Sequence, residues 1–264
     1  MKNILIYTVH KAASMFLHQL TIDAAHEFGI DYYSINNSRY FDEIKQSSWK
    51  IFIENKLKEN QSQQSCFGPI RSGITDAIFP EALSEYSVIL HLRDPRDVLT
   101  SFFFYHTYSH LKRKKGFNPD TAPKKPWQDG EIDDFVLAQL PSFKARYHLL
   151  ISILLGNDNV KFMKYEDMVS NYSAWLDRFL SAFSYLDVSS KQTPKPSAEA
   201  NFTAKIHQKL FEKYKDEFVI PIEENIYRHK RVIKPGDHRN KLQPNTIEIL
   251  DSEFSSILTS LSYT

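Results

Sequence analysis

The fold is decided by the opening stretch NILIYTVHKAASMFL, residues 3–17. Its first seven residues are apolar, aromatic or β-branched with almost no polar interruption, which is typical of a buried parallel strand. A helical pattern follows the short HKAAS segment, with apolar residues on one face as far as Phe28 and a glycine, Gly29, where a helix commonly ends. A second strand is expected at 30–35. The chain therefore opens with a strand–loop–helix–strand unit, which favours a parallel sheet.

The same alternation continues along the rest of the chain. We expect further strands at 86–92 and 160–165, and helices at 40–60, after Pro95, and at 132–155, 172–185, 198–216 and 245–260. Residues 112–130 are rich in Lys, Pro, Gly and Asp, which predicts a long loop. With no internal repeat and no clear boundary, the expected fold class is α/β: one domain over 1–264 with a central parallel sheet flanked by helices.

Composition narrows the classes of function and setting. The 264 residues carry a net charge of +1, so no basic field points to nucleic acid as a partner. Cys66 is the only cysteine, which excludes an internal disulfide and a CxxC metal site and indicates a reducing, cytoplasmic location. The N-terminal apolar stretch is too short for a signal peptide, and no segment has the roughly 18 apolar residues of a membrane span.

The loop after the first strand is a candidate anion site. A loop that leads from a parallel strand into a helix offers backbone N–H groups and the positive end of the helix dipole. Lys11 adds a charge and Ser14 a hydroxyl, a combination that suits a 5′-phosphate. The alternative is that Ser14 only caps the helix and Lys11 is a solvated loop residue. The segment lacks both glycines of GxxxxGK[ST], which argues against a nucleotide triphosphate site of that class.

A second candidate anion site follows the strand at 86–92. Asp94 and Pro95 are a good N-cap and first helical residue, so a helix start is well specified there. Arg93 and Ser101 can converge near this helix start, where a phosphate monoester is the natural guest. The alternative is a helix start with incidental surface arginines. Two such sites on neighbouring strand ends suit a nucleoside with phosphate at both ends.

With these segments the chain resembles the sulfotransferases that use 3′-phosphoadenosine 5′-phosphosulfate (PAPS). Four segments resemble, in the family order, the 5′-phosphosulfate loop, the 3′-phosphate motif, the strand ending in Tyr-Glu-Asp and the C-terminal loop over the nucleotide. They are YTVHKAASMFL at 7–17, VILHLRDPRDVLTS at 88–101, FMKYEDM at 162–168 and RVIKPGDHRN at 231–240. The resemblance implies a P-loop-like sulfotransferase fold, PAPS as donor without a metal, and a small-molecule or glycan acceptor.

The resemblance also implies roles for individual residues. Arg93, Ser101 and Arg231 would bind the 3′-phosphate, and Tyr165 would lie near the adenosine, or serve only as an aromatic core residue at a strand end. The phosphosulfate would be held by Lys11 with the backbone of Ala12, Ala13, Ser14 and Met15. The sequence departs from the family at two places. Ala13 stands where glycine is usual, and binding is expected to persist if this residue needs no positive φ. At 232–233, Val-Ile replaces the usual Lys-Gly.

Sulfuryl transfer passes through a loose in-line transition state, in which Lys11 would neutralise charge on the leaving oxygen. The acceptor must lose a proton, and the Lys-Thr-His segment that carries the family's basic histidine is replaced by GPIRS at 68–72. Arg71 cannot be a base, but it can orient an anionic acceptor or the sulfate. We rank His106 first as the catalytic base; the other candidates are His10, Asp76, Glu43 and Glu27.

Two alternatives to a sulfotransferase stay open on the sequence. The missing histidine segment and Ala13 are compatible with a catalytically silent nucleotide-binding module, and a P-loop kinase is the third possibility. The basic run Lys112–Lys115 is either a solvated loop or a surface that attracts a sulfated or acidic acceptor.

Overall fold

The fold is described by a computed structural model of the chain. It describes residues 2–34, 38–60, 63–71, 80–108, 111, 117–118, 121–123, 125–184, 198–218, 224–227 and 234–263. The chain forms two compact units. The first comprises Met1–Leu92 and Ile153–Glu217, and the second comprises Arg93–Ser152 and Phe218–Thr264. The assignment of 1–264 to a single domain stays a prediction.

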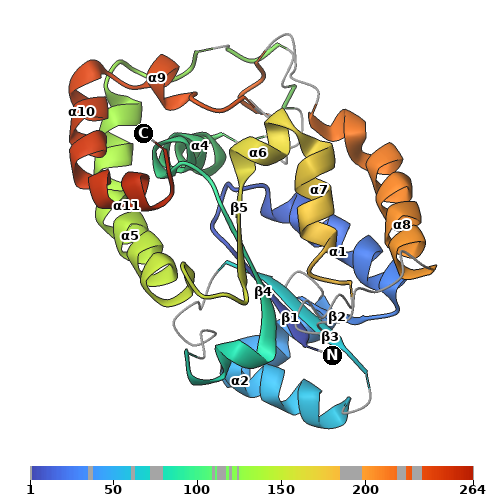
Figure 1. The fold of residues 1–264 in the computed structure, drawn as a ribbon. Coiled ribbons are helices and arrows are strands. Elements are labelled where there is room, and N and C mark those ends of the chain that lie inside the picture. Colours follow the sequence, from blue (N-terminus) through green and yellow to red (C-terminus); the bar gives the residue numbers. More distant parts are fainter. Residues whose placement is uncertain are drawn as a thin grey trace. The chain divides into compact units, whose positions relative to one another are not determined.

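The first unit contains a parallel sheet of five strands in the order β2-β3-β1-β4-β5 (Figure 1). The strands are β1 (Asn3–Thr8), β2 (Asp31–Tyr33), β3 (Ser65–Ile70), β4 (Tyr86–Leu92) and β5 (Val160–Lys164). Its helices are α1 (Ser14–Phe28), α2 (Ser38–Glu59), α6 (Tyr165–Ser170), α7 (Tyr172–Leu180) and α8 (Ala198–Tyr214), with the 3₁₀ turns η1 (Pro80–Glu85) and η3 (Lys215–Phe218, whose last residue falls in the second unit). The predicted α/β class with a central parallel sheet is confirmed.

Strand β1 lies at the centre because it is apolar on both faces. Its residues 4–8 are all buried, as expected for a parallel strand with neighbours on both sides. It pairs with β3 on one side and with β4 on the other, where Thr8 stands opposite His91. Helix α1 packs against β2 and β3 through a buried face that includes Leu17 and Leu20. The loop that joins β1 to α1 is therefore anchored at both of its ends.

Strand β3 was not predicted from the sequence. The strand reads SCFGPI, and glycine and proline in its second half argue against a strand in a sequence analysis. The structure accommodates them with a break in the register between Leu5 and Tyr7 of β1. Gly68 has φ +128°, and an added Cβ there would lie 2.5 Å from the carbonyl oxygen of Ile6. A side chain is thus excluded at this position by the close approach of the neighbouring strand.

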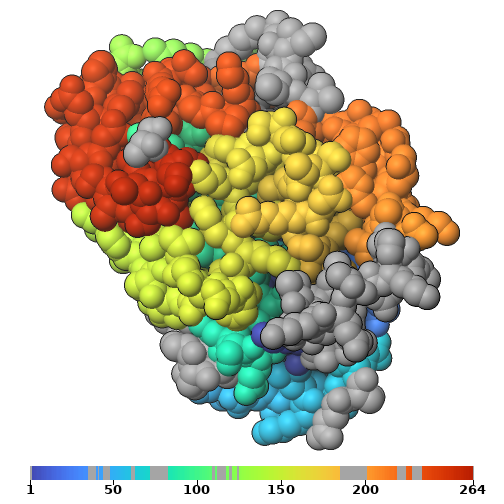
Figure 2. Space-filling model, in the orientation of Figure 1, coloured from blue at the N-terminus to red at the C-terminus, as the bar shows by residue number. Residues whose placement is uncertain are grey.

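The second unit is helical. It holds α4 (Pro95–Thr107), nearly all of α5 (Glu131–Leu154), α9 (His238–Lys241), α10 (Pro244–Glu253) and α11 (Ser255–Ser260). Figure 2 shows the red C-terminal helices beside the yellow-green α5, and Lys144 of α5 pairs with Glu253 of α10 at 2.9 Å. The single helix predicted at 245–260 is two helices, because the chain leaves helical geometry at Phe254 (φ −94°, ψ 4°). In the described part of the chain, no helix is both long and apolar enough to cross a bilayer.

Candidate active site

The loop after β1 is curled by two residues in the left-handed conformation, Lys11 with φ 67° and Ala13 with φ 56°. Ala13 is the N-cap of α1 and offers no side-chain hydrogen bond, and Ser14 is the first helical residue. The alternative in which Ser14 caps the helix is therefore wrong. Ala13 does adopt the positive φ that glycine favours. The departure from the family at this position thus concerns a residue that holds a glycine-like conformation.

This uncapped helix start is suited to an anion. The N–H groups of Ser14 and Met15 have no partner within the helix, because the first turn of an α-helix leaves its donors unused. The first turn of α1 contains no acidic side chain that would compete for them. Met15 is 45% exposed as a residue, so the helix start reaches the surface there. Lys11 belongs to the same loop and adds a positive charge.

Arg71, just beyond the end of β3, approaches this loop from the side. Its Nη1 donates a hydrogen bond of 3.1 Å to Oγ of Ser14. One helical turn further along α1, Nδ1 of His18 lies 2.6 Å from the hydroxyl of Tyr32 on β2. The Tyr32 hydroxyl in turn donates to the carbonyl oxygen of Gly68 at 2.7 Å. Sequence reasoning named Arg71 as a residue that can orient an anionic acceptor or the sulfate. It did not find His18 or Tyr32, because their contact forms only when β2 and β3 are paired.

A buried histidine lies at the end of β4 in the same unit. The His91 side chain is fully buried, and its ring meets Trp175 of α7 edge-on, with 5.5 Å between the ring centres. Burial lowers the pKa of His91 to about 3, partly opposed by the backbone of Ala12. His91 is therefore neutral at any pH near 7.

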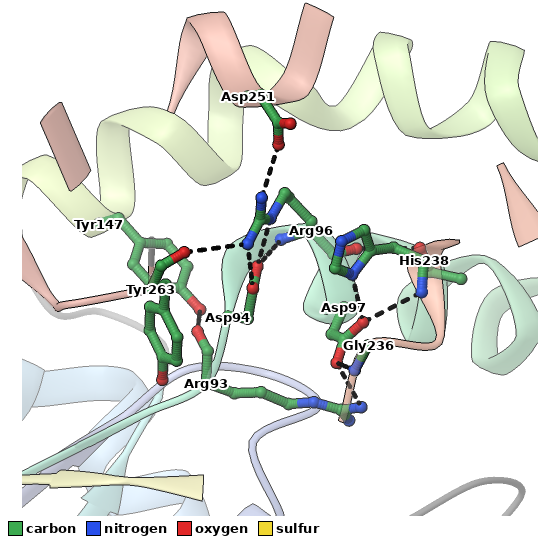
Figure 3. Close-up of polar contacts among 10 residues, drawn as sticks. Arg93, Asp94, Arg96, Asp97, Tyr147, Gly236, His238, Asp251 and Tyr263 are labelled. Atoms are coloured by element: carbon green, nitrogen blue, oxygen red, sulfur yellow. Dashed lines mark hydrogen bonds and ion pairs between the residues drawn. The ribbon is translucent and has the colours of Figure 1, made fainter. Parts of the chain in front are cut away.

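The second candidate anion site begins at Arg93 in the second unit (Figure 3). Asp94 caps α4, because its carboxylate accepts a hydrogen bond of 2.9 Å from the backbone N–H of Arg96, and Pro95 is the first helical residue. Both helix-start predictions are confirmed. The main chain of Arg93 is fixed by the hydroxyl of Tyr147, which donates to the Arg93 carbonyl oxygen at 2.6 Å.

The two arginines of this segment differ in their contacts, and neither is on the surface. Arg96 is 6% exposed, and its guanidinium pairs with Asp94 and with Asp251, each at 2.6 Å. Arg93 is 4% exposed and reaches Asp97 at 3.5 Å, at the outer limit of a hydrogen bond. Arg96 therefore holds the helix start to α10, and the role of Arg93 as a ligand residue stays a prediction.

Asp97 joins the start of α4 to the C-terminal segment. Its carboxylate accepts from the backbone N–H of Gly236 at 2.7 Å, from the backbone N–H of His238 at 3.1 Å and from Nδ1 of His238 at 2.6 Å (Figure 3). Burial alone would raise the pKa of Asp97, but the hydrogen bond from His238 and the charge of Arg93 hold it well below its usual range. Sequence reasoning assigned Asp97 no such role, because its partners lie 139 and 141 residues away along the chain.

The remaining predicted residues are distributed as follows. Ser101 and His106 are on α4 in the second unit, and the His106 ring lies 6.2 Å from that of Phe102 and 5.5 Å from that of Phe135. Lys11, Ala12, Ala13, Ser14, Met15 and Tyr165 are in the first unit. Tyr165 is 5% exposed and is the first residue of α6, directly after β5, so the strand predicted at 160–165 is confirmed except for its last residue.

Several other candidates have structural contacts or lie outside the described residues. Glu27 pairs with Lys209 of α8 at 2.7 Å, and Glu43 pairs with Lys56 at 3.5 Å within α2, contacts typical of surface ion pairs. Outside the described residues lie Arg231, Asp76 and Lys112–Lys115. Within the described residues, no group of three or more His, Cys, Asp or Glu side chains is placed to hold a metal ion.

Comparison with known proteins identifies the family. The family model for the sulfotransferase domain matches residues 1–261. The structure is similar to that of mouse sulfotransferase SULT7A1 complexed with PAP, with a TM-score of 0.53, 12% identity and coverage of 97% of this chain and 84% of the mouse chain. It is also similar to retinol dehydratase in complex with androsterone and inactive cofactor PAP, with a TM-score of 0.50, 13% identity and coverage of 97% and 80%. A search of curated protein sequences finds no match. Because the family model spans nearly the whole chain, this protein belongs to the sulfotransferase family.

Proposed function

We propose that the protein transfers a sulfuryl group from PAPS to a hydroxyl or amine of a small-molecule or glycan acceptor. The observation that carries this proposal is the uncapped start of α1, where Ala13 holds a left-handed conformation and Lys11 adds a charge. Backbone donors and the helix dipole at such a site favour a phosphate-like group. Family membership makes the phosphosulfate of PAPS the natural occupant.

Lys11 and the backbone of residues 12–15 would bind the 5′-phosphosulfate. As the bond between sulfur and the bridging oxygen breaks, negative charge grows on that oxygen, and the Lys11 ammonium would stabilise it. This charge comes from the protein itself, so the proposed reaction needs no metal. Tyr165 is proposed to lie near the adenosine.

Arg93 and Ser101 would bind the 3′-phosphate, with Arg231 as a further ligand from the C-terminal segment. An arginine suits this role because its planar guanidinium pairs with two phosphate oxygens at once. The Tyr147 hydroxyl and Asp97 fix the backbone and the side chain of Arg93 before any ligand arrives. A preorganised arginine loses less entropy on binding than a mobile one.

The similar solved structures support the proposed ligands. The mouse sulfotransferase and retinol dehydratase are both described in complex with PAP, and the latter also with androsterone, a small molecule. The proposed setting is the cytoplasm, where the single buried cysteine, Cys66, stays reduced.

Isothermal titration calorimetry with PAP tests the nucleotide site. Arg93→Ala should weaken PAP binding by roughly 2–4 kcal/mol, because a buried charge pair with phosphate is lost. Lys11→Ala should abolish most sulfuryl transfer while the far-ultraviolet circular dichroism stays that of the wild type. Lys58→Ala, which alters an exposed lysine on α2, is the matched control. Unaltered PAP affinity in Arg93→Ala, or unaltered turnover in Lys11→Ala, would contradict the roles assigned.

A second candidate function is nucleotide binding without turnover. It is favoured by the absence of the Lys-Thr-His segment, whose place in the chain is taken by Gly68–Ser72. Under this alternative the wild-type protein binds PAP but transfers no sulfuryl group to a panel of phenols, alcohols, amines and glycans. Transfer to any member of the panel decides for the enzyme.

A further inference from the structure

The group that accepts the proton from the acceptor is the missing part of the proposed reaction. His18 is the histidine that stands closest in sequence after the anion loop, one turn of α1 beyond Ser14. Its side chain is half-buried, so it is held in place and still accessible. Arg71 contacts Ser14 at 3.1 Å and acts electrostatically on His18, so the three side chains form one cluster in the first unit.

The hydrogen-bond chain through Tyr32 fixes which nitrogen of His18 carries the hydrogen. The Tyr32 hydroxyl has a single hydrogen, and it donates this to the carbonyl oxygen of Gly68 at 2.7 Å. In the 2.6 Å hydrogen bond between His18 and Tyr32, Nδ1 of His18 must therefore be the donor and the Tyr32 oxygen the acceptor. In the neutral ring, Nε2 is then the nitrogen with the lone pair. The hydrogen bond from Nδ1 to Tyr32 thus leaves Nε2 as the nitrogen that can accept a proton.

The surroundings of His18 also keep the ring neutral. Tyr32 of β2 contacts the His18 ring, and Arg71 after β3 acts on it through its charge. Burial, and then the positive charge of Arg71, lower the pKa of His18 below its ordinary value. The imidazole is therefore unprotonated near pH 7, the form that a general base requires.

We propose that Nε2 of His18 is the general base of the sulfuryl transfer, held in the active tautomer by Tyr32. The proposal rests on the proposed function. In the step, the acceptor oxygen or nitrogen forms a bond to sulfur while its proton passes to Nε2. The bond between sulfur and the bridging oxygen breaks, and PAP leaves with that electron pair. The His18 imidazolium then returns its proton to solvent. Tyr32 is a positioning residue, since it acts through His18.

The first test reads the tautomer and needs no turnover. In protein labelled with nitrogen-15 in histidine, long-range proton–nitrogen correlation spectra near pH 7 should show His18 with the hydrogen on Nδ1 and an unprotonated Nε2. His18→Asn identifies the signal by its loss. In Tyr32→Phe the preference for this tautomer should weaken. A wild-type His18 with its hydrogen on Nε2 would overturn the proposal.

The second test measures transfer. The probes are radiolabelled PAPS with water as the acceptor, read as sulfate release, and with phenol, whose hydroxyl keeps its proton across the assay range, read as the aryl sulfate. His18→Asn keeps a donor near the Nδ1 position but has no base, so the rate should fall by about 10²–10⁴-fold. The matched control is His26→Asn, which alters an 84% exposed histidine on the same helix and should leave the rate unchanged.

The pH profile and PAP affinity separate the base from a merely structural histidine. The wild-type kcat should fall as the pH drops through the pKa of His18, because the imidazolium cannot accept a proton, and this limb should be missing in His18→Asn. PAP affinity should stay within about twofold of the wild type in that variant, since a base makes no ground-state contact with the nucleotide. An equal rate in His18→Asn, or loss of the acid limb in His106→Asn instead, would overturn the role of His18.

Failure of the proposed function gives a different result. A wild-type protein that does not bind PAP fails as a sulfotransferase whatever His18 does. A wild-type protein that binds PAP and transfers sulfuryl groups, together with a His18→Asn variant of equal rate, refutes only the assignment of the base.

Discussion

Replacement of Ala13 by glycine should stabilise the protein, although glycine usually destabilises. Ala13 has φ 56° and ψ 30°, a left-handed conformation that costs an L-residue about 1–2 kcal/mol. Glycine removes this cost, but its greater backbone freedom stabilises the unfolded chain by about 0.5–1 kcal/mol. The difference predicts a net gain of about 1 kcal/mol in the free energy of unfolding. With an unfolding entropy of about 2.1 cal/mol/K per residue, the gain raises Tm by roughly 2 °C.

The assay is a guanidinium titration followed by circular dichroism, supported by differential scanning calorimetry. Ala12→Gly is the matched control, because Ala12 is the preceding residue, is fully buried and does not have a positive φ. This control should lose stability, since it gains glycine's entropy cost and relieves no strain. Ala12→Gly also removes a fully buried methyl group, so the backbone conformation of Ala13 is read from the sign of the change in Ala13→Gly relative to the wild type.

The same variants report on the proposed nucleotide site. If the left-handed conformation of Ala13 is the one that binds phosphate, glycine keeps it available, and PAP affinity should stay within about twofold of the wild type. A guanidinium midpoint of unfolding in Ala13→Gly as low as that of Ala12→Gly would refute the reasoning. It would mean that Ala13 carries no conformational strain in the folded protein.

Three further predictions concern buried charge and the basic loop. The pKa of His91, about 3, lies below the ordinary 6.5, so its contribution to stability is complete above about pH 6.5 and is lost as the pH falls. In denaturant titrations the free energy of unfolding should fall by roughly 2 kcal/mol by pH 5, and His91→Gln should remove this loss. Equal losses in the wild type and in His91→Gln would contradict the prediction. Asp97→Asn should lower the free energy of unfolding by about 3 kcal/mol and weaken PAP binding, because Arg93 and His238 lose a buried anion; unchanged values would disprove its anchoring role. Replacing the basic residues of Lys112–Lys115 with glutamine should raise the KM of a sulfated glycan acceptor and reduce the dependence of this KM on salt. An unchanged KM and salt dependence would mean that the basic run is a solvated loop without a role in acceptor binding.

The fold could be predicted from the sequence wherever burial dictates residue type. The central strands β1 and β4 are continuous apolar runs, and their predicted bounds differ from those observed by a single residue at most. The sequence fails at β3, where Gly68 and Pro69 break the pattern of a strand that is nevertheless fully buried. There the deciding factor is the close approach of β1 to Gly68, a tertiary contact that no local propensity records.

The candidate site was predictable where one segment carries it. The cap of α4 by Asp94 follows from residue types and spacing alone, and the anion-binding character of the loop after β1 stays a prediction. The contacts from Arg71 to Ser14 and from Asp97 to His238 span 57 and 141 residues, so only the folded chain shows them. The left-handed conformation of Ala13 was also hidden, because alanine rarely adopts it and its sequence suggests an ordinary helix start.

Placing the base on α1 has a mechanical consequence for the proposed reaction. Ser14 and His18 are one turn apart, a rise of about 5.4–6 Å along a single helix. The buried face of that helix, which includes Leu17 and Leu20, packs against the sheet and immobilises both residues together. Binding the phosphosulfate at the helix start would therefore fix the sulfur relative to Nε2 of His18 without any loop closing over the base. An orientation built into one rigid element is available before the acceptor arrives, and its entropy has already been lost on folding.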